Sequence, residues 1–381
     1  MIIDFSLFVV SMVFALLGLL LEDITSMGIE WMAVFRYLPL LVIYIKHFRK
    51  DFSSFIPLLF SLFLFSLSFL RGHYSMSGML STIMLPVVLF VYTKVRFSRR
   101  QISIIALLVL ASLFLYYIIS LVRRHSINPN QIAFKILILT VIYFFCVHTN
   151  DRRKRIVIHT LYDRKRTIGA PGFILLFTIS FFLILFTKSR NSLLVYLMLA
   201  AAFVVRERVA KWNVWGLLMF GLLVLYFVYP FVYCLLSDSF KGTADTEMMG
   251  QDVFSGREYI WASIFAQLTD SSHFLFGGID TDWWGKSMHN SAIDIVVRYG
   301  VPAAVIIELI IFYYFKKVCL MCNNHYRPLL LLIITTMIWG LNESGLFLRL
   351  SYFLYFPYCI LLSKNKGVGQ QIKKISQNTL R

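Results

Sequence analysis

Residues 102–122 read ISIIALLVLASLFLYYIISLV, an apolar run that contains no charged side chain. An α-helix rises about 1.5 Å per residue, so about 20 apolar residues cross the roughly 30 Å hydrocarbon core of a bilayer. Residues 5–21 and 212–236 have the same character. The sequence therefore predicts helices that cross a membrane.

Runs of this kind recur along the whole chain. Of its 381 residues, 59% are hydrophobic and 15% are charged, whereas soluble domains average about 45–50% apolar and about 25% charged residues. We expect an all-α polytopic integral membrane protein with about twelve transmembrane helices. The twelve spans are residues 5–21, 31–45, 52–70, 76–92, 102–122, 132–148, 171–187, 191–205, 212–236, 291–315, 328–341 and 346–362.

Basic residues predict the orientation of these spans. The net charge is +18, and most Lys and Arg lie in short loops between apolar runs, a distribution that argues against nucleic acid as a partner. Cytosolic loops of membrane proteins carry an excess of Lys and Arg. With the amino terminus in the cytosol, every second loop is rich in basic residues. Both termini are therefore expected in the cytosol, with residues 5–21 as an uncleaved first span.

This topology divides the chain into four parts. Residues 1–236 hold spans one to nine, 237–288 form a large external loop, 289–363 hold spans ten to twelve, and 364–381 form a cytosolic tail. Apolar side chains recur at helical spacing through residues 258–268 of the external loop. This pattern predicts an amphipathic helix that lies on the membrane or over a cavity.

His289 and Asn290 stand where the external loop meets the tenth span. Polar residues at the edge of the hydrocarbon core are costly, so they are functional-site candidates. An imidazole there can accept a proton from a hydroxyl group and act as a general base. The alternative is a structural histidine with a local hydrogen bond, and the sequence of this motif leaves both interpretations open.

Several cations lie on the external side, against the general charge pattern. Lys188 and Arg190 lie in the short turn before the eighth span, and Arg257 lies in the external loop. A guanidinium group can hold a phosphate group through two hydrogen bonds, although Arg190 could instead snorkel and Arg257 could form a plain salt bridge. Arg298 is a further candidate, but Asp294 lies one helical turn before it and favours an internal ion pair. Five more arginines lie near external ends of spans: Arg36, Arg71, Arg123, Arg124 and Arg349.

The turn Asn128-Pro129-Asn130 follows the fifth span. Proline fixes φ and asparagine bonds to the local backbone, so the turn has a sufficient structural explanation. The amides of Asn128 and Asn130, like that of Asn290, are also candidates for binding sugar hydroxyls. The structural interpretation is favoured for the turn.

Groups of metal-ligating residues are too small to predict a metal site. Asp280 and Asp282 are a weak signal, because Asp-x-Asp alone is common in solvated loops. Cys319, Cys322 and His325 offer three ligands, whereas a structural zinc site has four. We therefore expect neither a metal nor a cofactor.

The order of these motifs resembles the O-antigen polymerase and O-antigen ligase superfamily. No single motif is specific to this superfamily. The ordered set of motifs is specific when it occurs on twelve spans with one large external loop near the carboxyl end of the chain. The resemblance in motifs extends over residues 128–303. The matching motifs, in chain order, are Ser189-Arg190, Gly256-Arg257 with Trp261, Gly277-Gly278, His289-Asn290 and Gly300.

The resemblance implies an all-helical glycosyltransferase of the bacterial inner membrane whose active site faces the periplasm. Enzymes of this superfamily act on glycans linked to undecaprenyl pyrophosphate, without a nucleotide sugar or a metal. Carried over to this chain, His289 would be the catalytic base and Arg190 and Arg257 would bind the pyrophosphate. Lys188 and Arg298 are further candidates for that anion.

Two features bear on the choice within the superfamily. Ala303 stands where ligases more often have Gly, Thr or Tyr, and the turn at residues 128–130 is more similar to that of polymerases. The resemblance thus favours a polymerase that moves a growing glycan from undecaprenyl pyrophosphate to the non-reducing end of the next lipid-linked repeat unit, with inversion at the anomeric carbon. The alternatives are a ligase that transfers polymer to lipid A core and a flippase for lipid-linked oligosaccharides. Candidate partners are the lipid-linked oligosaccharide, membrane lipid and a chain-length regulator protein.

Overall fold

The computed structural model describes residues 2–25, 30–48, 52–71, 76–122, 129–150, 170–205, 212–240, 247–248, 251–252, 256–279, 288–322, 327–343 and 351–363. Most of these residues are helical. The α-helices are α1 Ile2–Thr25, α2 Glu30–His47, α3 Phe52–Arg71, α4 Met76–Lys94, α5 Arg99–Val122, α6 Pro129–Asn150, α7 Ala170–Phe186, α8 Arg190–Val205, α9 Trp212–Phe240, α10 Arg257–Gln267, α11 Ser271–Phe276, α12 Ser291–Tyr299, α13 Val301–Met321, α14 Leu330–Met337, α15 Ser351–Leu354 and α16 Pro357–Ser363. Short 3-10 helices are η3 (Arg327–Leu329) and η4 (Ile338–Leu341), and a small antiparallel hairpin pairs β1 (Glu247–Met248) with β2 (Gln251–Asp252).

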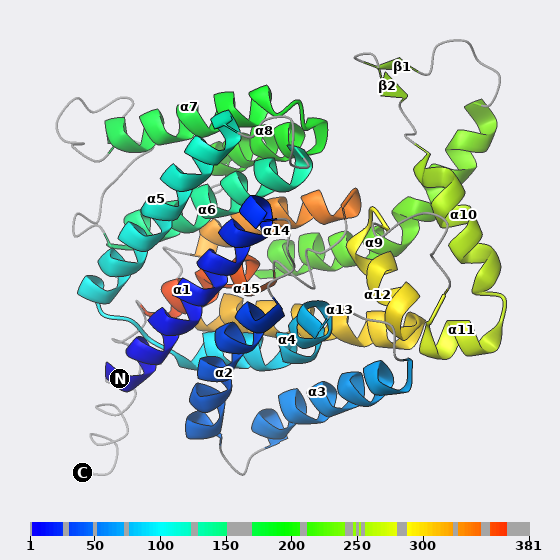
Figure 1. Cartoon of the computed structure of the whole chain (residues 1–381), viewed down its shortest axis with the longest axis horizontal. Coiled ribbons are helices and arrows are strands. Elements are labelled where there is room, and N and C mark those ends of the chain that lie inside the picture. The colour runs from blue at the N-terminus through cyan, green and yellow to red at the C-terminus, as the bar shows by residue number, and fades with distance from the viewer. Residues whose placement is uncertain are drawn as a thin grey trace.

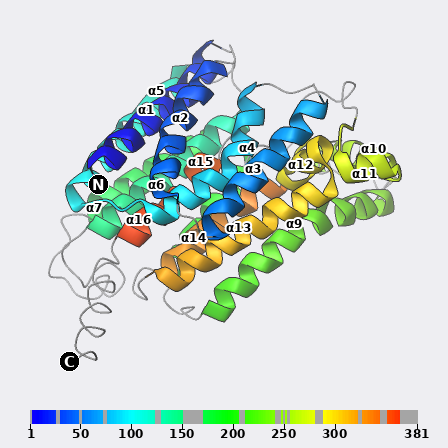
Figure 2. The ribbon, with the colours of Figure 1, turned by 90° about the horizontal axis from the view of Figure 1, so that it is seen from below.

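The helices pack side by side into one bundle (Figures 1 and 2). The start of α1 lies at one end of the bundle, and α10 and α11 lie at the opposite end in both views. Helix α16 lies near the start of α1 in Figure 2. This separation is the one expected if the helices cross a membrane and α10 and α11 belong to the external loop.

Four helices in the described part of the chain are long and apolar enough to cross a membrane. They contain the segments Ile3–Leu21, Arg99–Ile119, Asn130–Val147 and Asn213–Ser237. Shorter apolar helical segments are Ser54–Leu67, Met79–Lys94, Leu175–Phe186, Arg190–Ala202, Arg327–Leu341 and Tyr352–Ser363. The expected all-α fold is confirmed, with helices long and apolar enough to span a membrane, and the count of twelve spans stays a prediction.

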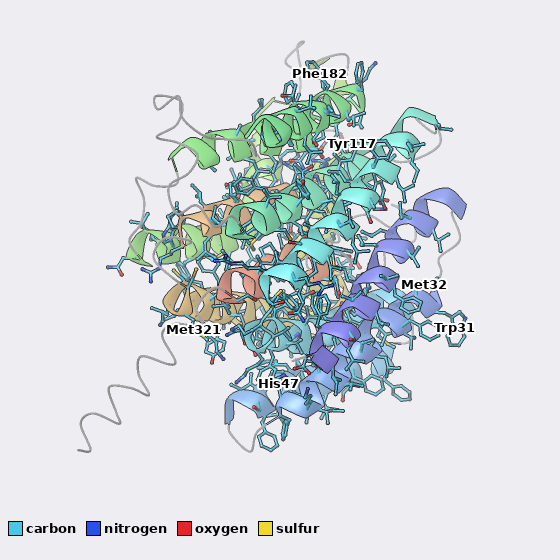
Figure 3. All side chains as sticks on the ribbon, turned by 90° about the vertical axis from the view of Figure 1, so that its left-hand side faces the viewer. Trp31, Met32, His47, Tyr117, Phe182 and Met321 are labelled. Atoms are coloured by element: carbon cyan, nitrogen blue, oxygen red, sulfur yellow. The ribbon has the colours of Figure 1, made fainter. Side chains whose placement is uncertain are left out.

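Large apolar side chains cover the outside of the bundle. Trp31 of α2 is 70% exposed and Phe182 of α7 is 49% exposed, and both lie at the edge of the molecule in Figure 3. Phe69, Leu107 and Leu217 are also well exposed. Soluble proteins rarely expose apolar surface on this scale. The hydrocarbon core of a bilayer is the solvent that such a surface fits.

The interior contains both close ring contacts and satisfied hydroxyl groups. Phe134 of α6 stacks on Trp339 of η4 with ring centroids 3.8 Å apart. The hydroxyl of Tyr117 in α5 lies 2.6 Å from the Ser180 hydroxyl in α7, and Figure 3 shows Tyr117 between helices of the bundle. Polar groups in a membrane bundle must find partners within the protein, because lipid offers none.

The tenth predicted span, residues 291–315, is not one helix. The structure breaks it at Gly300, so that α12 ends at Tyr299 and α13 begins at Val301. Gly300 has a φ of 87°, in the region that favours glycine, and Pro302 occupies the first turn of α13, where its missing N–H is not needed. Hydropathy did not reveal the break, since the residues on both sides of it are mostly apolar.

Two glycines bring the backbone of α11 against that of α12. A Cβ atom at Gly300 would lie 2.5 Å from the carbonyl oxygen of Leu275, and one at Gly277 would lie 2.6 Å from backbone atoms of Arg298. The neighbouring N–H of Gly278 donates to the carbonyl of Val297 at 2.7 Å. This contact fixes the external segment to the end of α12.

The helix predicted within residues 258–268 is confirmed as α10. Its Trp261 and Ile264 are fully buried, whereas Tyr259 is exposed. The Trp261 ring packs edge-on against Tyr233 of α9, with centroids 5.0 Å apart. Helix α10 therefore packs on the last turns of α9, which extends four residues past the predicted end of the ninth span.

Candidate functional site

Glu343, directly after η4, is a buried carboxylate on which three other elements converge. Its Oε1 accepts a hydrogen bond from Nδ2 of Asn130 at 2.8 Å and lies 3.6 Å from Nη2 of Arg257. Its Oε2 lies 3.8 Å from Nδ1 of His289. The first turn of α6, the start of α10 and the segment before α12 thus meet at one negative charge.

Arg257 is the first residue of α10, and the backbone before it is fixed by a glycine. Gly256 has a φ of 73°, a conformation that costs glycine little and other residues more. Nη1 of Arg257 donates to Oδ1 of Asn342 at 3.1 Å, and the same oxygen accepts the hydroxyl of Tyr229 at 2.6 Å. Nε of Arg257 is buried without a hydrogen-bond partner. This N–H is therefore an unsatisfied donor at the edge of the Glu343 cluster.

His289 is placed by the residue that follows it. Asn290 is the N-cap of α12, and its Oδ1 accepts two backbone N–H groups of the first turn at 2.9 and 3.0 Å. Its Nδ2 donates to the carbonyls of Tyr226 and Leu341, each at 3.2 Å. Asn290 is fully buried, so its amide is occupied inside the protein. The His289 side chain remains 31% exposed, and its Nδ1 has no hydrogen-bond partner.

A hydrogen bond of Trp261 links the segment that carries Arg257 to the segment that carries His289. Its Nε1 donates to the carbonyl of Met288 at 2.8 Å. Met288 and Trp261 belong to a small buried cluster with Ile264. Arg257 and Trp261 share α10, and Met288 precedes His289, so this bond links the two motifs.

Arg190 opens α8, next to the segment that leads to Glu343. The following residue, Asn191, donates from Nδ2 to the carbonyl of Trp339 at 3.0 Å. Trp339 belongs to η4, and η4 runs directly into Asn342 and Glu343. The start of α8 therefore lies beside η4, the element that precedes the central carboxylate.

The structure does not bring every candidate to Glu343. Arg298, in the last turn of α12, instead pairs with Asp294 at 2.9 Å, which confirms the expected internal ion pair. Lys188 is exposed in the turn before α8, with a φ of 57°. Other candidates lie outside the described residues: Asn128, Asp280, Asp282 and His325.

Sequence reasoning missed Glu343 and Asn342. Both lie in the short turn between the eleventh and twelfth predicted spans, which contained no recognised motif. The available signal was an acid in an external turn of a few residues between two long apolar runs. A charge in such a position is costly unless the protein pairs it.

The cluster combines groups suited to proton transfer and to anion binding. An imidazole next to a carboxylate can act as a general base, and a guanidinium with an unused N–H can stabilise developing negative charge. Within the described ranges, no group of three His, Cys, Asp or Glu residues is close enough to hold a metal ion. No protein-family model, curated protein or solved structure matches this chain. Function is therefore inferred from the residues and their geometry.

Proposed function

We propose that this protein is an O-antigen polymerase, a membrane glycosyltransferase that uses a glycan linked to undecaprenyl pyrophosphate as its donor. The observation that carries the proposal is the convergence of His289 and Arg257 on the buried carboxylate of Glu343. These motifs are far apart in sequence and are the two that the superfamily resemblance assigns to the base and to pyrophosphate binding. The start of α8, with Arg190, lies beside the same segment.

The proposed reaction moves one proton and exchanges one bond. His289 takes the proton of an acceptor hydroxyl, whose oxygen then bonds to the anomeric carbon of the donor from the opposite face. The bond between that carbon and the pyrophosphate oxygen breaks, and the lipid pyrophosphate leaves with the electron pair. Arg257, with Arg190, stabilises its negative charge. The negative charge of Glu343, 3.8 Å from Nδ1 of His289, stabilises the protonated imidazole. Inversion at the anomeric carbon follows from the direction of attack.

The lipid chain of such a donor needs an apolar place below the phosphate site. An apolar pocket lies between α6, α7, α8 and α14, lined by Phe144, Phe177, Tyr196, Leu199 and Leu332 among others. Tyr196 and Leu199 lie further along the helix that Arg190 opens. This pocket is too small for an isoprenoid chain, so the chain of a donor bound at the start of α8 would lie against the exposed apolar side chains of that helix, Leu194 and Leu197.

The proposed setting is the bacterial inner membrane, with both termini in the cytosol and Glu343 on the periplasmic side. The substrates are two lipid-linked oligosaccharides, and a chain-length regulator protein is a candidate partner. The bundle arrangement supports this setting, because the start of α1 and the external helices α10 and α11 lie at opposite ends.

Complementation of a deletion strain tests the proposal. His289→Ala should abolish the ladder of long surface glycans on a gel while the protein remains in the membrane, because loss of a general base lowers the rate about 10²–10⁴-fold. His273→Ala is the matched control, since His273 lies on α11 and its Nδ1 lies 3.3 Å from the backbone carbonyl oxygen of Gln267. A normal ladder from His289→Ala would refute the assigned role.

The deletion strain itself separates polymerase from ligase. Loss of a polymerase leaves lipid A core capped by one repeat unit, because the ligase still transfers single units. Loss of a ligase leaves bare core and a polymer that stays on its lipid carrier. Bare core in the deletion strain would therefore overturn the polymerase assignment. It would support a ligase, which performs the same glycosyl transfer with lipid A core as the acceptor.

A further inference from the structure

A second guanidinium group is buried inside the bundle, away from Glu343. Arg36 lies in the second turn of α2 and is only 8% exposed. Its Nη2 donates to the hydroxyl of Ser81 in α4 at 3.0 Å, and its Cζ lies 4.4 Å from the ring centroid of Tyr37. Arg36 thus faces the interior, between α2 and α4, at the ends of those helices that the charge pattern places outside.

No carboxylate in the described part of the chain pairs with Arg36. The hydrogen bond to Ser81 uses one of the five N–H donors of the guanidinium. Nε of Arg36 is buried without a partner, and so is the hydroxyl of the adjacent Tyr37. An uncompensated buried cation is strongly destabilising, and buried donors normally have acceptors. Two donors without acceptors, beside a buried cation that has only neutral partners, are the pattern expected around a missing anion.

We propose that Arg36, Tyr37 and Ser81 form a second anion-binding site, which takes a phosphate or pyrophosphate group. A phosphate oxygen accepts several hydrogen bonds and matches the guanidinium fork. The Tyr352 hydroxyl extends the polar surroundings of this site, since it interacts electrostatically with Arg36 and lies 3.0 Å from the hydroxyl of Ser11.

The assignment of an occupant rests on the proposed function. A polymerase joins two lipid-linked glycans, so it must hold two lipid pyrophosphate groups at once. Arg257 and Arg190 hold that of the donor, whose bond breaks. The Arg36 site then holds the pyrophosphate of the acceptor repeat unit, whose bond stays intact. Tyr352, which borders the Arg36 site, lies on α15, the next described element after Glu343. One short stretch of the sequence therefore contributes residues to both sites.

Binding of two probes to purified protein in detergent tests this site. The probes are farnesyl pyrophosphate and inorganic pyrophosphate, measured by calorimetry with wild type and with Arg36→Gln, Arg257→Gln and the double variant. Each single variant should keep one site and weaken the other at least about tenfold, the effect of losing one charge-assisted contact. The double variant should lose both sites. Arg99→Gln, an exposed arginine at the start of α5, is the control that should bind as wild type does.

The two probes separate the possible sources of the anion. Preference for farnesyl pyrophosphate at the Arg36 site supports a lipid headgroup, and equal binding supports a free phosphate compound. Wild-type binding by Arg36→Gln, measured in the Arg257→Gln background, would overturn the site.

A variant with a side chain of similar length tests whether misfolding, rather than loss of the site, explains a loss of probe binding. Arg36→Met should melt at least as high as wild type without ligand, because it removes an unpaired buried charge, and should lose stabilisation by the probe at this site. A lower melting temperature together with unchanged probe binding would show a structural arginine. The assay needs no glycosyl transfer, so a binding result at Arg36 stands even if His289→Ala leaves the glycan ladder intact.

Discussion

Glu343 carries its charge where only protein neighbours can stabilise it. Glu343→Gln keeps the shape and the contact with Asn130 but removes the negative charge that faces Arg257 and His289. We expect glycan polymerisation to fall roughly 10- to 10,000-fold, as found when a carboxylate that orients a histidine base is neutralised. The measurement is the glycan ladder of a complemented deletion strain, at matched membrane abundance.

Glu308 provides the control for this substitution. It is a second buried acid, in α13, with an oxygen that lacks a hydrogen-bond partner. Glu308→Gln should leave the ladder unchanged, because among the described residues Glu308 forms no ion pair with His289 or Arg257, unlike Glu343. Equal effects of the two substitutions would contradict a special role for Glu343.

Trp261 tests the link between α10 and the catalytic segment. Trp261→Phe keeps a ring against Tyr233 but leaves the buried carbonyl of Met288 without its donor. A buried acceptor that loses its partner costs about 1–3 kcal/mol, so we expect a lower melting temperature and reduced polymerisation. Trp215→Phe is the matched control, since Trp215 is also fully buried but its Nε1 has no partner to lose. A larger loss from Trp215→Phe would contradict this account.

Residue types made His289 and Arg257 candidates but left structural roles open for both, and the resemblance to a superfamily supplied their proposed roles. The same reasoning could not find Glu343, since its partners come from three distant segments and no local sequence pattern identifies them. The spacing of Arg298 and Asp294 was enough to predict their ion pair, which the structure confirms, whereas the pairing of Arg257 with Glu343 is visible only in the structure.

Elements were predicted best where hydropathy alone defines them. The long helices α5 and α9 and the amphipathic α10 correspond closely to runs that are visible in the sequence. The division between α12 and α13 was missed, because both halves are apolar and the break depends on a backbone conformation at Gly300. Backbone contacts with a distant segment leave no trace in hydropathy.

The contact between α11 and α12 predicts a strong effect of a small substitution. Gly300→Ala would place a methyl group 2.5 Å from the carbonyl oxygen of Leu275, at a φ that disfavours alanine. Strained backbone alone costs about 1–3 kcal/mol, so the melting temperature in detergent should fall. Gly221→Ala is the control, since nothing lies within 4 Å of its Cβ position in α9. Alanine there should be neutral or stabilise by about 0.5–1 kcal/mol, and a similar loss at both positions would contradict the close contact.

The membrane topology makes a prediction for the whole molecule. Tyr259 on α10 and Arg99 at the start of α5 are both exposed, and the charge pattern puts them on opposite sides of the membrane. A membrane-impermeant thiol reagent should label Tyr259→Cys in cells with a permeable outer membrane, but label Arg99→Cys only after lysis. The unmodified chain is the blank. Labelling of both positions in intact inner membranes, or of Arg99→Cys alone, would show that the orientation is wrong.

The membrane character of the whole molecule could be predicted from its composition. Helices that are long and apolar enough to cross a bilayer support that prediction. The number of crossings was harder to predict. Segments such as α14 with its flanking 3-10 turns are short, apolar and largely buried. Apolar length alone does not distinguish a span from a core element in such cases.

The short helix α12 is held at both ends by hydrogen bonds to other segments of the protein. Asn290 binds backbone carbonyls beside its start, and Gly278 binds the carbonyl of Val297 near its end. We expect a thinner or thicker bilayer to tilt long peripheral helices such as α1 and α5 while the imidazole of His289 keeps its distance from Glu343. Lipid composition should then alter how readily substrates arrive rather than how the proton acceptor is aligned.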